Sequence, residues 1–191
     1  MPHKFEAARF ARLMSVERRR ELPPDEILRQ AALAPGETVV DIGSGPGFIA
    51  LPAARLVGSR GRVIGLDVSP IMLAELRKNA RRAGLSNVRA ARITESAPAI
   101  PPGADVYLVV NVIHEFDDPA AHLAAIRRAM TVRSRLVIVD FLKKKSKHGP
   151  PLADRIPLSR ITPLLRSAGF KVNRIFRANA EEYGIVARKG L

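Results

Sequence analysis

Short runs of β-branched and aliphatic residues alternate along the chain with stretches whose apolar positions recur every three to four residues. The first pattern predicts strands, and the second predicts helices. Five predicted strands are separated by helical stretches or loops, and they occupy residues 38–42, 62–67, 87–93, 106–110 and 135–140. Strands that alternate with helices indicate a parallel sheet with helices on both of its faces.

The end of the chain follows another pattern. A helix predicted at residues 159–168 ends at Gly169, and two strand-like runs follow at residues 170–177 and 182–187. Because the connection between these runs is very short, they are expected to pair antiparallel. The predicted fold class is therefore α/β, a doubly wound, mostly parallel seven-stranded sheet with a C-terminal antiparallel hairpin.

Residues 1–34 have helical periodicity, which is broken where prolines follow Leu22. Their apolar positions could close one face over a pocket or simply cover the sheet, and both interpretations stay open. These positions are Phe5, Phe10, Leu13 and Met14. We expect residues 1–34 to form a helical lid segment and residues 35–191 to form the main domain.

A glycine-rich loop lies between the first predicted strand and the following helix. It reads Asp41-Ile42-Gly43-Ser44-Gly45-Pro46-Gly47, and Asp67 ends the second strand. A nicotinamide-binding loop requires G-x-G-x-x-G, whereas position 48 is Phe. A carboxylate at Asp41 would repel a diphosphate but could hold a cationic amino-acid ligand. Asp67 can accept both hydroxyls of a ribose, although either acid could instead cap a turn or helix.

The segments 39–47 and 63–69 resemble the first two motifs of the class I S-adenosylmethionine-dependent methyltransferases. The similarity covers about residues 25–190. The overall pattern most resembles the small enzymes related to the ubiquinone/menaquinone-biosynthesis group. This resemblance implies a Rossmann-like fold, S-adenosylmethionine as the cofactor, and a methyltransferase domain over residues 35–191.

Roles for individual residues follow from the same resemblance. The glycine loop would wrap the methionine part of the cofactor, through Gly43, Ser44, Gly45 and Gly47. Asp41 would orient the amino group, Asp67 would bind the ribose hydroxyls, and Val68 would pack on the adenine. The family often places an acid after the third strand, and here Thr94 or Glu95 is the candidate for that position.

The segment after the fourth predicted strand should open onto the cofactor pocket. Asn111 would line the cofactor side, and His114 is the best candidate for a general base because imidazole titrates near neutrality. Glu115 is a second catalytic candidate. Both side chains could equally be structural, at a helix start. Asp117-Asp118-Pro119 is expected to cap the next helix.

Features that the sequence lacks narrow the possible classes of methyl acceptor. Enzymes that methylate the exocyclic amines of nucleobases resemble one another in an [Asp/Asn/Ser]-Pro-Pro-[Tyr/Phe] motif after strand four. The segment after the fourth predicted strand does not match this motif. The absence of cysteine excludes disulfides, thiolate metal sites, cytosine C5 methylation through a thiolate, and arsenite methylation as its family performs it. The other histidines show no metal-ligand spacing, so no metal is expected; they are His3, His122 and His148.

The formal net charge of +14 invites a nucleic-acid interpretation, although the arginines are spread over nearly all predicted helices. No apolar run is long enough for a membrane span, and the N-terminus lacks a secretory signal, so a cytoplasmic protein is expected. The leading hypothesis is methyl transfer to a small-molecule oxygen, carbon or nitrogen acceptor. The alternatives are an RNA- or ribosome-directed methyltransferase, motivated by the charge and residues 143–147, and a non-catalytic cofactor-binding module.

Overall fold

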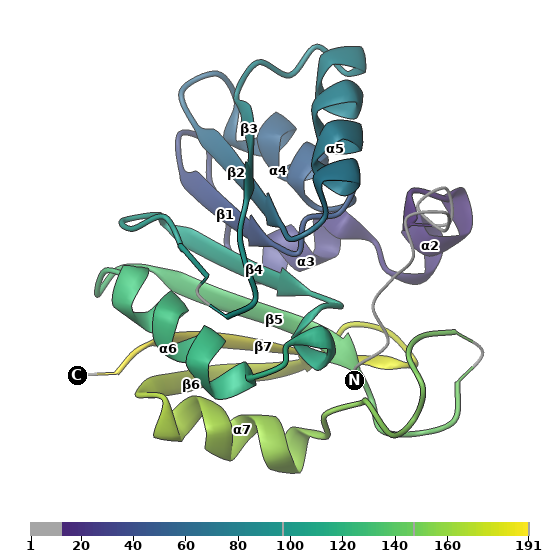
Figure 1. Cartoon of the computed structure of the whole chain (residues 1–191), viewed down its shortest axis with the longest axis vertical. Helices are drawn as coiled ribbons and strands as arrows, with labels where there is room; N and C mark the ends of the chain where they lie inside the picture. The colour runs from purple at the N-terminus through teal and green to yellow at the C-terminus, as the bar shows by residue number, and fades with distance from the viewer. Residues whose placement is uncertain (1–12, 97, 147, 191) are drawn as a thin grey trace.

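The computed structural model describes residues 13–96, 98–146 and 148–190, and it contains one seven-stranded sheet in the order β3-β2-β1-β4-β5-β7-β6 (Figure 1). The strands are β1 (Thr38–Ile42), β2 (Arg62–Asp67), β3 (Val88–Arg92), β4 (Val106–Val110), β5 (Arg135–Phe141), β6 (Phe170–Arg177) and β7 (Glu182–Lys189). The first five strands pair in parallel, and β7 pairs antiparallel with both β5 and β6. The predicted fold class is confirmed.

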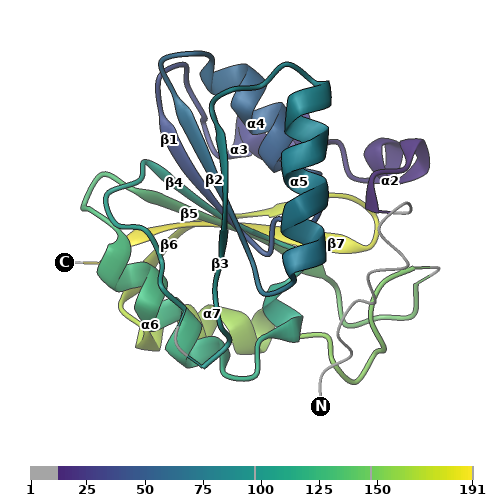
Figure 2. The ribbon, with the colours of Figure 1, turned by 45° about the horizontal axis from the view of Figure 1, so that its top comes forward.

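The sheet is covered on both faces by helices. These are α3 (Pro24–Gln30), α4 (Ala50–Val57) and α5 (Pro70–Arg82) in one layer, and α6 (Pro119–Ala129) and α7 (Leu158–Ser167) in the other. Figure 2 shows the two layers on opposite sides of the twisted sheet, with the short helix α2 (Val16–Glu21) lying beside the first layer. Within the described residues, no helix is long and apolar enough to cross a membrane.

Local sequence explains where the helices begin. Ser69 precedes Pro70, and its hydroxyl accepts a hydrogen bond from the backbone N–H of Met72 at 3.3 Å. Asp118 precedes Pro119 and accepts a hydrogen bond from Ala121 N–H at 3.0 Å, which confirms the predicted cap. A capping side chain satisfies an N–H group that the helix leaves unpaired, and proline at the first helical position loses no hydrogen bond.

Strand order creates the crevice that carries the site. β1 lies between β2 and β4, so the chain reverses its direction of travel across the sheet at the β1–β4 boundary. Ligands of doubly wound sheets bind beyond the carboxyl ends of the strands at such a point. The loops that follow β1 and β4 therefore face each other across one crevice.

The C-terminal hairpin brings a distant segment to the same edge of the sheet. β7 runs antiparallel between β5 and β6, with Phe141 opposite Glu182 and Asp140 opposite Tyr183. It extends past the predicted end at residue 187 because Arg188 still pairs with both neighbours and Lys189 still pairs with β6. The start of β7 consequently lies beside the carboxyl end of β5.

Candidate active site

The glycine loop turns sharply between β1 and α4. Gly43 and Gly47 have φ values of 71° and 102°, a region that residues with a Cβ adopt at a cost. A Cβ on Gly43 would lie 2.4 Å from Cγ2 of Val112, and one on Gly47 would lie 2.8 Å from Cδ1 of Leu76. The loop is therefore closely packed against the segment after β4 and against α5, and glycine is required at both positions.

Asp67 fastens the glycine loop to the end of β2. Its Oδ2 accepts a hydrogen bond from Gly45 N–H and its Oδ1 accepts one from Ser69 N–H, both at 2.9 Å. Burial raises the pKa of Asp67, and the backbone N–H groups of Ser69, Gly45 and Val68 oppose that rise. Asp67 is thus a structural clamp as well as a group on the pocket wall.

One pocket lies over the crevice. Most of the residues predicted to hold the cofactor line it, together with one predicted catalytic residue: Asp41, Gly43, Ser44, Gly45, Asp67, Val68, Glu95, Asn111 and Glu115. Gly47 turns the chain beneath the pocket, and Thr94 is exposed outside its wall. Of the two candidates after β3, the geometry therefore favours Glu95.

The pocket wall contains acceptor atoms that meet no described donor. Oδ2 of Asp41 and Oδ1 of Asn111 are both buried, and neither atom makes a hydrogen bond with a described residue. Asp41 is 3% exposed, and burial raises its pKa to about 7, assisted by the nearby charge of Asp67. A buried acceptor without a partner is costly, so this part of the wall suits a ligand that carries a cationic donor.

Asn111 is held in a strained conformation by a partner from the hairpin. Its φ of 56° is unusual for a residue other than glycine, and its Nδ2 donates to Oε1 of Glu182 at 2.6 Å. Glu182 is buried, and its Oε2 accepts a second hydrogen bond from Nδ2 of Asn179 at 2.5 Å. Strain of this kind persists where surrounding contacts enforce it, often at functional sites. The hairpin thus fixes the Asn111 amide and leaves its Oδ1 toward the pocket.

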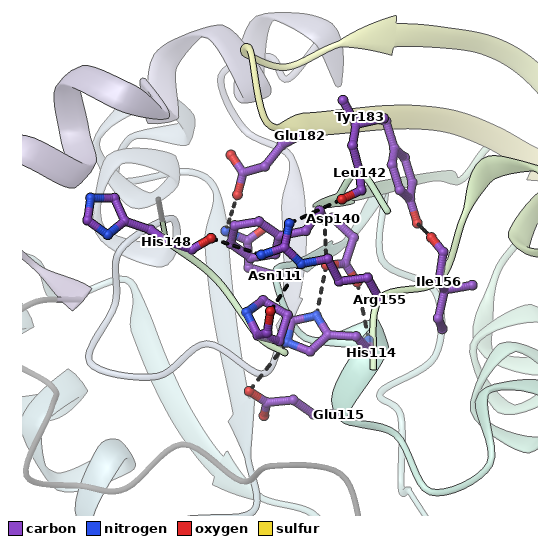
Figure 3. A network of polar contacts seen from close by, with 12 residues as sticks. Asn111, His114, Glu115, Asp140, Leu142, His148, Arg155, Ile156, Glu182 and Tyr183 are labelled. Atoms are coloured by element: carbon purple, nitrogen blue, oxygen red, sulfur yellow. Dashed lines mark hydrogen bonds and ion pairs between the residues drawn. The ribbon is translucent and has the colours of Figure 1, made fainter. Parts of the chain in front are cut away.

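His114 forms a buried pair with Asp140 at the end of β5 (Figure 3). Its Nδ1 lies 2.7 Å from Oδ1 of Asp140, and its backbone N–H donates to Oδ2 of the same carboxylate at 3.2 Å. Burial of the ring lowers the pKa of His114, but the charge of Asp140 and the hydrogen bond to it outweigh that effect, so the pKa is raised overall. The pair fixes the ring orientation and leaves Nε2 as the group available for proton transfer.

Glu115, rather than His114, reaches the wall of the pocket. His114 instead lines a second hollow, which lies between the segment after β4 and helix α7. The two side chains remain close, since Nε2 of His114 is 3.8 Å from Oε1 of Glu115. Burial raises the pKa of Glu115 to about 7, with the nearby His114 opposing that rise. The carboxyl group that faces the pocket is therefore able to exchange a proton near neutral pH.

Phe116 forms the partition between the pocket and the second hollow. Its side chain lines both spaces. The ring stacks on the ring of His122 with centroids 4.0 Å apart, and Nδ1 of His122 lies 3.0 Å from the backbone carbonyl of Asp118. His122 thus packs on Phe116 at the start of α6, and it also lines the pocket.

Arg155 holds the segment that contains the predicted basic loop. Its side chain is 5% exposed and lies in the network of Figure 3. The guanidinium group donates hydrogen bonds of 2.8–3.2 Å to the backbone carbonyls of Leu142, Lys144, His148 and Pro150. These hydrogen bonds hold the guanidinium group against the backbone of residues 142–150.

Charged residues of the site that were not predicted from the sequence are Arg18, Asp140 and Glu182. Asp140 carries a recognisable signal, because an acid directly ends a buried strand, as Asp67 does. Glu182 and Arg18 carry no such signal, because their neighbours in sequence do not indicate a pocket.

The predicted lid residues are only partly described. Phe5 and Phe10 lie outside the described residues. Leu13 lines the pocket, and Met14 packs against the first core layer. Within the described ranges, no group of three or more His, Asp or Glu side chains is arranged to hold a metal ion.

Comparison with known proteins identifies the family. The family described as "Methyltransferase domain" matches residues 33–179. A crystal structure of a SAM-dependent methyltransferase from Aquifex aeolicus superposes with a TM-score of 0.91 at 26% identity, covering 96% of this chain and 98% of that one.

Two curated enzymes are also similar. The ribosomal protein L11 methyltransferase of Thermus thermophilus is 31% identical over 141 residues, which is 73% of this chain and 47% of the relative. The ubiquinone/menaquinone biosynthesis C-methyltransferase UbiE of a Marinomonas species is 28% identical over 124 residues, 63% of this chain and 49% of the relative. The chain thus spans about half the length of these two relatives. Taken together with the fold and the glycine loop, these matches show that the chain belongs to the class I S-adenosylmethionine-dependent methyltransferases.

Proposed function

We propose that this methyltransferase transfers a methyl group to a small-molecule oxygen, carbon or nitrogen acceptor from which Glu115 removes a proton. The observation that carries this proposal is the position of Glu115 in the pocket wall, with a pKa of about 7. A base is most effective when its pKa lies near the working pH. Nε2 of His114 lies 3.8 Å from Oε1 of Glu115.

The residues of the pocket fit S-adenosylmethionine. The buried acceptor atoms of Asp41 and Asn111 suit its ammonium group, because each lacks a described donor. Asp67 would take the ribose hydroxyls with its remaining lone pairs, and Glu95 would meet the adenine amino group. Val68, which is 38% exposed, would cover one face of the base. When bound, the cofactor supplies an electrophilic methyl group on its sulfonium sulfur.

The protein side of the reaction is a proton relay. Glu115 would accept the proton of the acceptor group as that group bonds to the methyl carbon and the carbon–sulfur bond of the sulfonium breaks. Nε2 of His114 can then take that proton, because Nδ1–H donates to Asp140 and the carboxylate stabilises the resulting imidazolium. Asp140 therefore acts as a positioning residue, while Glu115 is the group that touches the acceptor.

A second candidate is an acceptor in RNA or the ribosome. It is favoured by the formal net charge of +14. Arginines lie on α2, α3 and β6, and these elements are neighbours: Arg174 on β6 donates to the carbonyl of Gln30 at 2.9 Å, and Asn179 donates to the carbonyl of Glu21 at 2.9 Å. Lysine and arginine side chains can bind phosphate groups through release of counterions.

The first experiment is calorimetric titration with S-adenosylmethionine and S-adenosylhomocysteine, followed by acceptor screening with a labelled methyl donor. The screen compares small-molecule extracts, total RNA and ribosomes from the same cells. Label in small molecules supports the first proposal, and label confined to RNA or ribosomal protein selects the second.

The role of Glu115 is then tested with Glu115→Gln and the matched variant Glu75→Gln, which changes a glutamate on α5 outside the pocket. We expect the Glu115 variant to lose roughly 100- to 1000-fold in turnover with cofactor affinity nearly unchanged. Full turnover in that variant would show that the transfer requires no base at this position.

A further inference from the structure

The second hollow adjoins the pocket at the segment that carries the catalytic candidates. It lies between the start of α6 and one side of α7, and the side chain of Phe116 lines both spaces. His114 lines the hollow, whereas the next residue, Glu115, lines the pocket. A molecule with one group at Glu115 can therefore extend over Phe116 into the hollow.

Polar side chains at the hollow have bonding capacity that the fold leaves unused. His114 is only 9% exposed, and its Nε2 forms no hydrogen bond with a described residue, the carboxylate of Glu115 being 3.8 Å away. Among the described residues, none forms a hydrogen bond or ion pair with the carboxylates of Asp117 and Asp154. Buried polar groups are normally hydrogen-bonded, so the free nitrogen of His114 indicates that this hollow receives a ligand.

The charge of the hollow is opposite to that of the chain. The chain has 32 lysines and arginines against 18 acidic residues. The described residues that line the hollow include three carboxylates and one guanidinium group, those of Asp117, Asp118, Asp154 and Arg160. A concave region of one sign of charge concentrates ligands of the opposite sign. The hollow therefore favours a cation and disfavours an anion.

The remaining lining of the hollow is largely apolar. It consists of Phe116, Pro119, Ala120, Ile156, Pro163 and Leu164. Small-molecule sites typically combine such a lining with a few polar groups that fix the orientation of the ligand. An apolar molecule with one cationic group matches this combination.

We propose that the second hollow binds the body of the methyl acceptor, and that this acceptor is an apolar molecule with an ammonium group held by Asp117 and Asp154. The inference rests on the proposed function, because it places the reacting group of the same molecule at Glu115. The ammonium group is the anchor and not the nucleophile, since a protonated amine has no lone pair with which to attack the methyl carbon.

The test uses three probes that share a 4-hydroxyphenyl group and differ in the charge at the other end. Tyramine is a cation near neutral pH, 4-ethylphenol is neutral, and 3-(4-hydroxyphenyl)propionate is an anion. Their affinities for the full chain are measured by NMR titration with S-adenosylhomocysteine present. The variants are Asp154→Asn and the control Asp25→Asn, which changes an exposed acid on α3 that lines neither space.

We expect tyramine to bind roughly 3- to 10-fold more tightly than 4-ethylphenol, and the propionate to bind most weakly. Asp154→Asn should weaken tyramine binding roughly 2- to 5-fold and leave the affinity for 4-ethylphenol unchanged, which a merely misfolded variant would not do. Asp25→Asn should behave like the unchanged protein.

Absence of tyramine binding at millimolar concentration would overturn the inference. So would equal affinities for the three probes, or an equal loss for all three in Asp154→Asn. The proposed function fails by a separate result, which is the absence of any labelled small molecule in the acceptor screen. The charge preference of the hollow is measured without methyl transfer, so the two failures are distinguishable.

Discussion

The two halves of the pocket are built in different ways. The glycine-loop half consists of β1, the loop at Asp41–Gly47 and the end of β2, and its clamp joins Gly45 to a residue 22 positions away. The proton half consists of Asn111, His114, Glu115, Asp140 and Glu182, and its longest link spans 71 positions. The first half is therefore a local motif, whereas the second depends on the order of the strands.

This difference implies that the two halves respond differently to substitution. Changes in the glycine-loop half should remove cofactor binding or strain the loop, because that half has little freedom to adjust. Changes at His114, Glu115 and Asp140 in the proton half should alter titration and turnover while the cofactor still binds. Four measurements sharpen this contrast, beginning with the close approach of Gly43 and Val112, which brings the two halves together.

Gly43→Ala should destabilise the protein by roughly 3 kcal/mol. The new Cβ would lie 2.4 Å from Cγ2 of Val112, and the residue would also keep a φ of 71°. Chemical unfolding measures the loss. The double variant Gly43→Ala/Val112→Ala should recover much of it, since the clash is relieved and only the backbone strain remains. Equal stability of the single and double variants would show that the halves are not packed together here.

Asp67→Asn should weaken cofactor binding by about 100-fold, or about 2.7 kcal/mol. The amide keeps one acceptor oxygen and turns the other into a donor, so the clamp on Gly45 or Ser69 is lost together with an acceptor for the ribose. Calorimetry measures the effect. Asp105→Asn is the matched control, because Asp105 also accepts a backbone N–H, that of Thr38 at 2.8 Å, but lies outside the pocket wall.

Asp41→Asn should stabilise the ligand-free protein at pH 8 by about 2 kcal/mol while weakening cofactor binding. The folded-state pKa of Asp41 is raised to about 7, above its ordinary value of 3.8. Because the pKa is raised in the folded state, the stability that this carboxyl group contributes is fully present below the pKa of the unfolded state. It is lost as the pH rises through 7. Urea unfolding should therefore show a higher free energy of unfolding for the variant than for the unchanged protein at pH 8. The difference should be smaller at pH 5.

Asp140→Asn should lower the pKa of His114 and remove a small pH dependence of stability. The pKa of His114 is raised in the folded state. The stability that this pair contributes is therefore present below the pKa of the unfolded state and is lost as the pH rises through the pKa of the folded state. NMR titration of the imidazole checks the pKa, and unfolding on both sides of neutrality checks the stability. An unchanged His114 titration would show that Asp140 does not act on the ring, and cofactor affinity serves as the internal control.

Much of the site was predictable because its first half is contiguous in sequence. The strand, the glycines and Asp67 form a pattern whose spacing already implies a turn and a ligand. Asn111 and Glu115 were also found, since they follow a fully buried strand. The preference for His114 over Glu115 as the general base rested on ordinary pKa values, whereas burial raises the pKa of Glu115 to about 7. Sequence does not report such a shift, because burial depends on neighbours from the whole chain.

The sequence by itself determined the fold class and the position of the glycine loop, because each depends on periodicity or on residues a few positions apart, and its resemblance to the class I methyltransferases implied the cofactor. The tertiary structure alone decided which side chains complete the site. Asp140, Glu182 and Arg18 arrive from β5, from the hairpin and from α2, and they meet only because β7 inserts beside β5 and α2 lies over the loop. Contacts between distant segments are set by strand order and packing, which no local pattern of residues encodes.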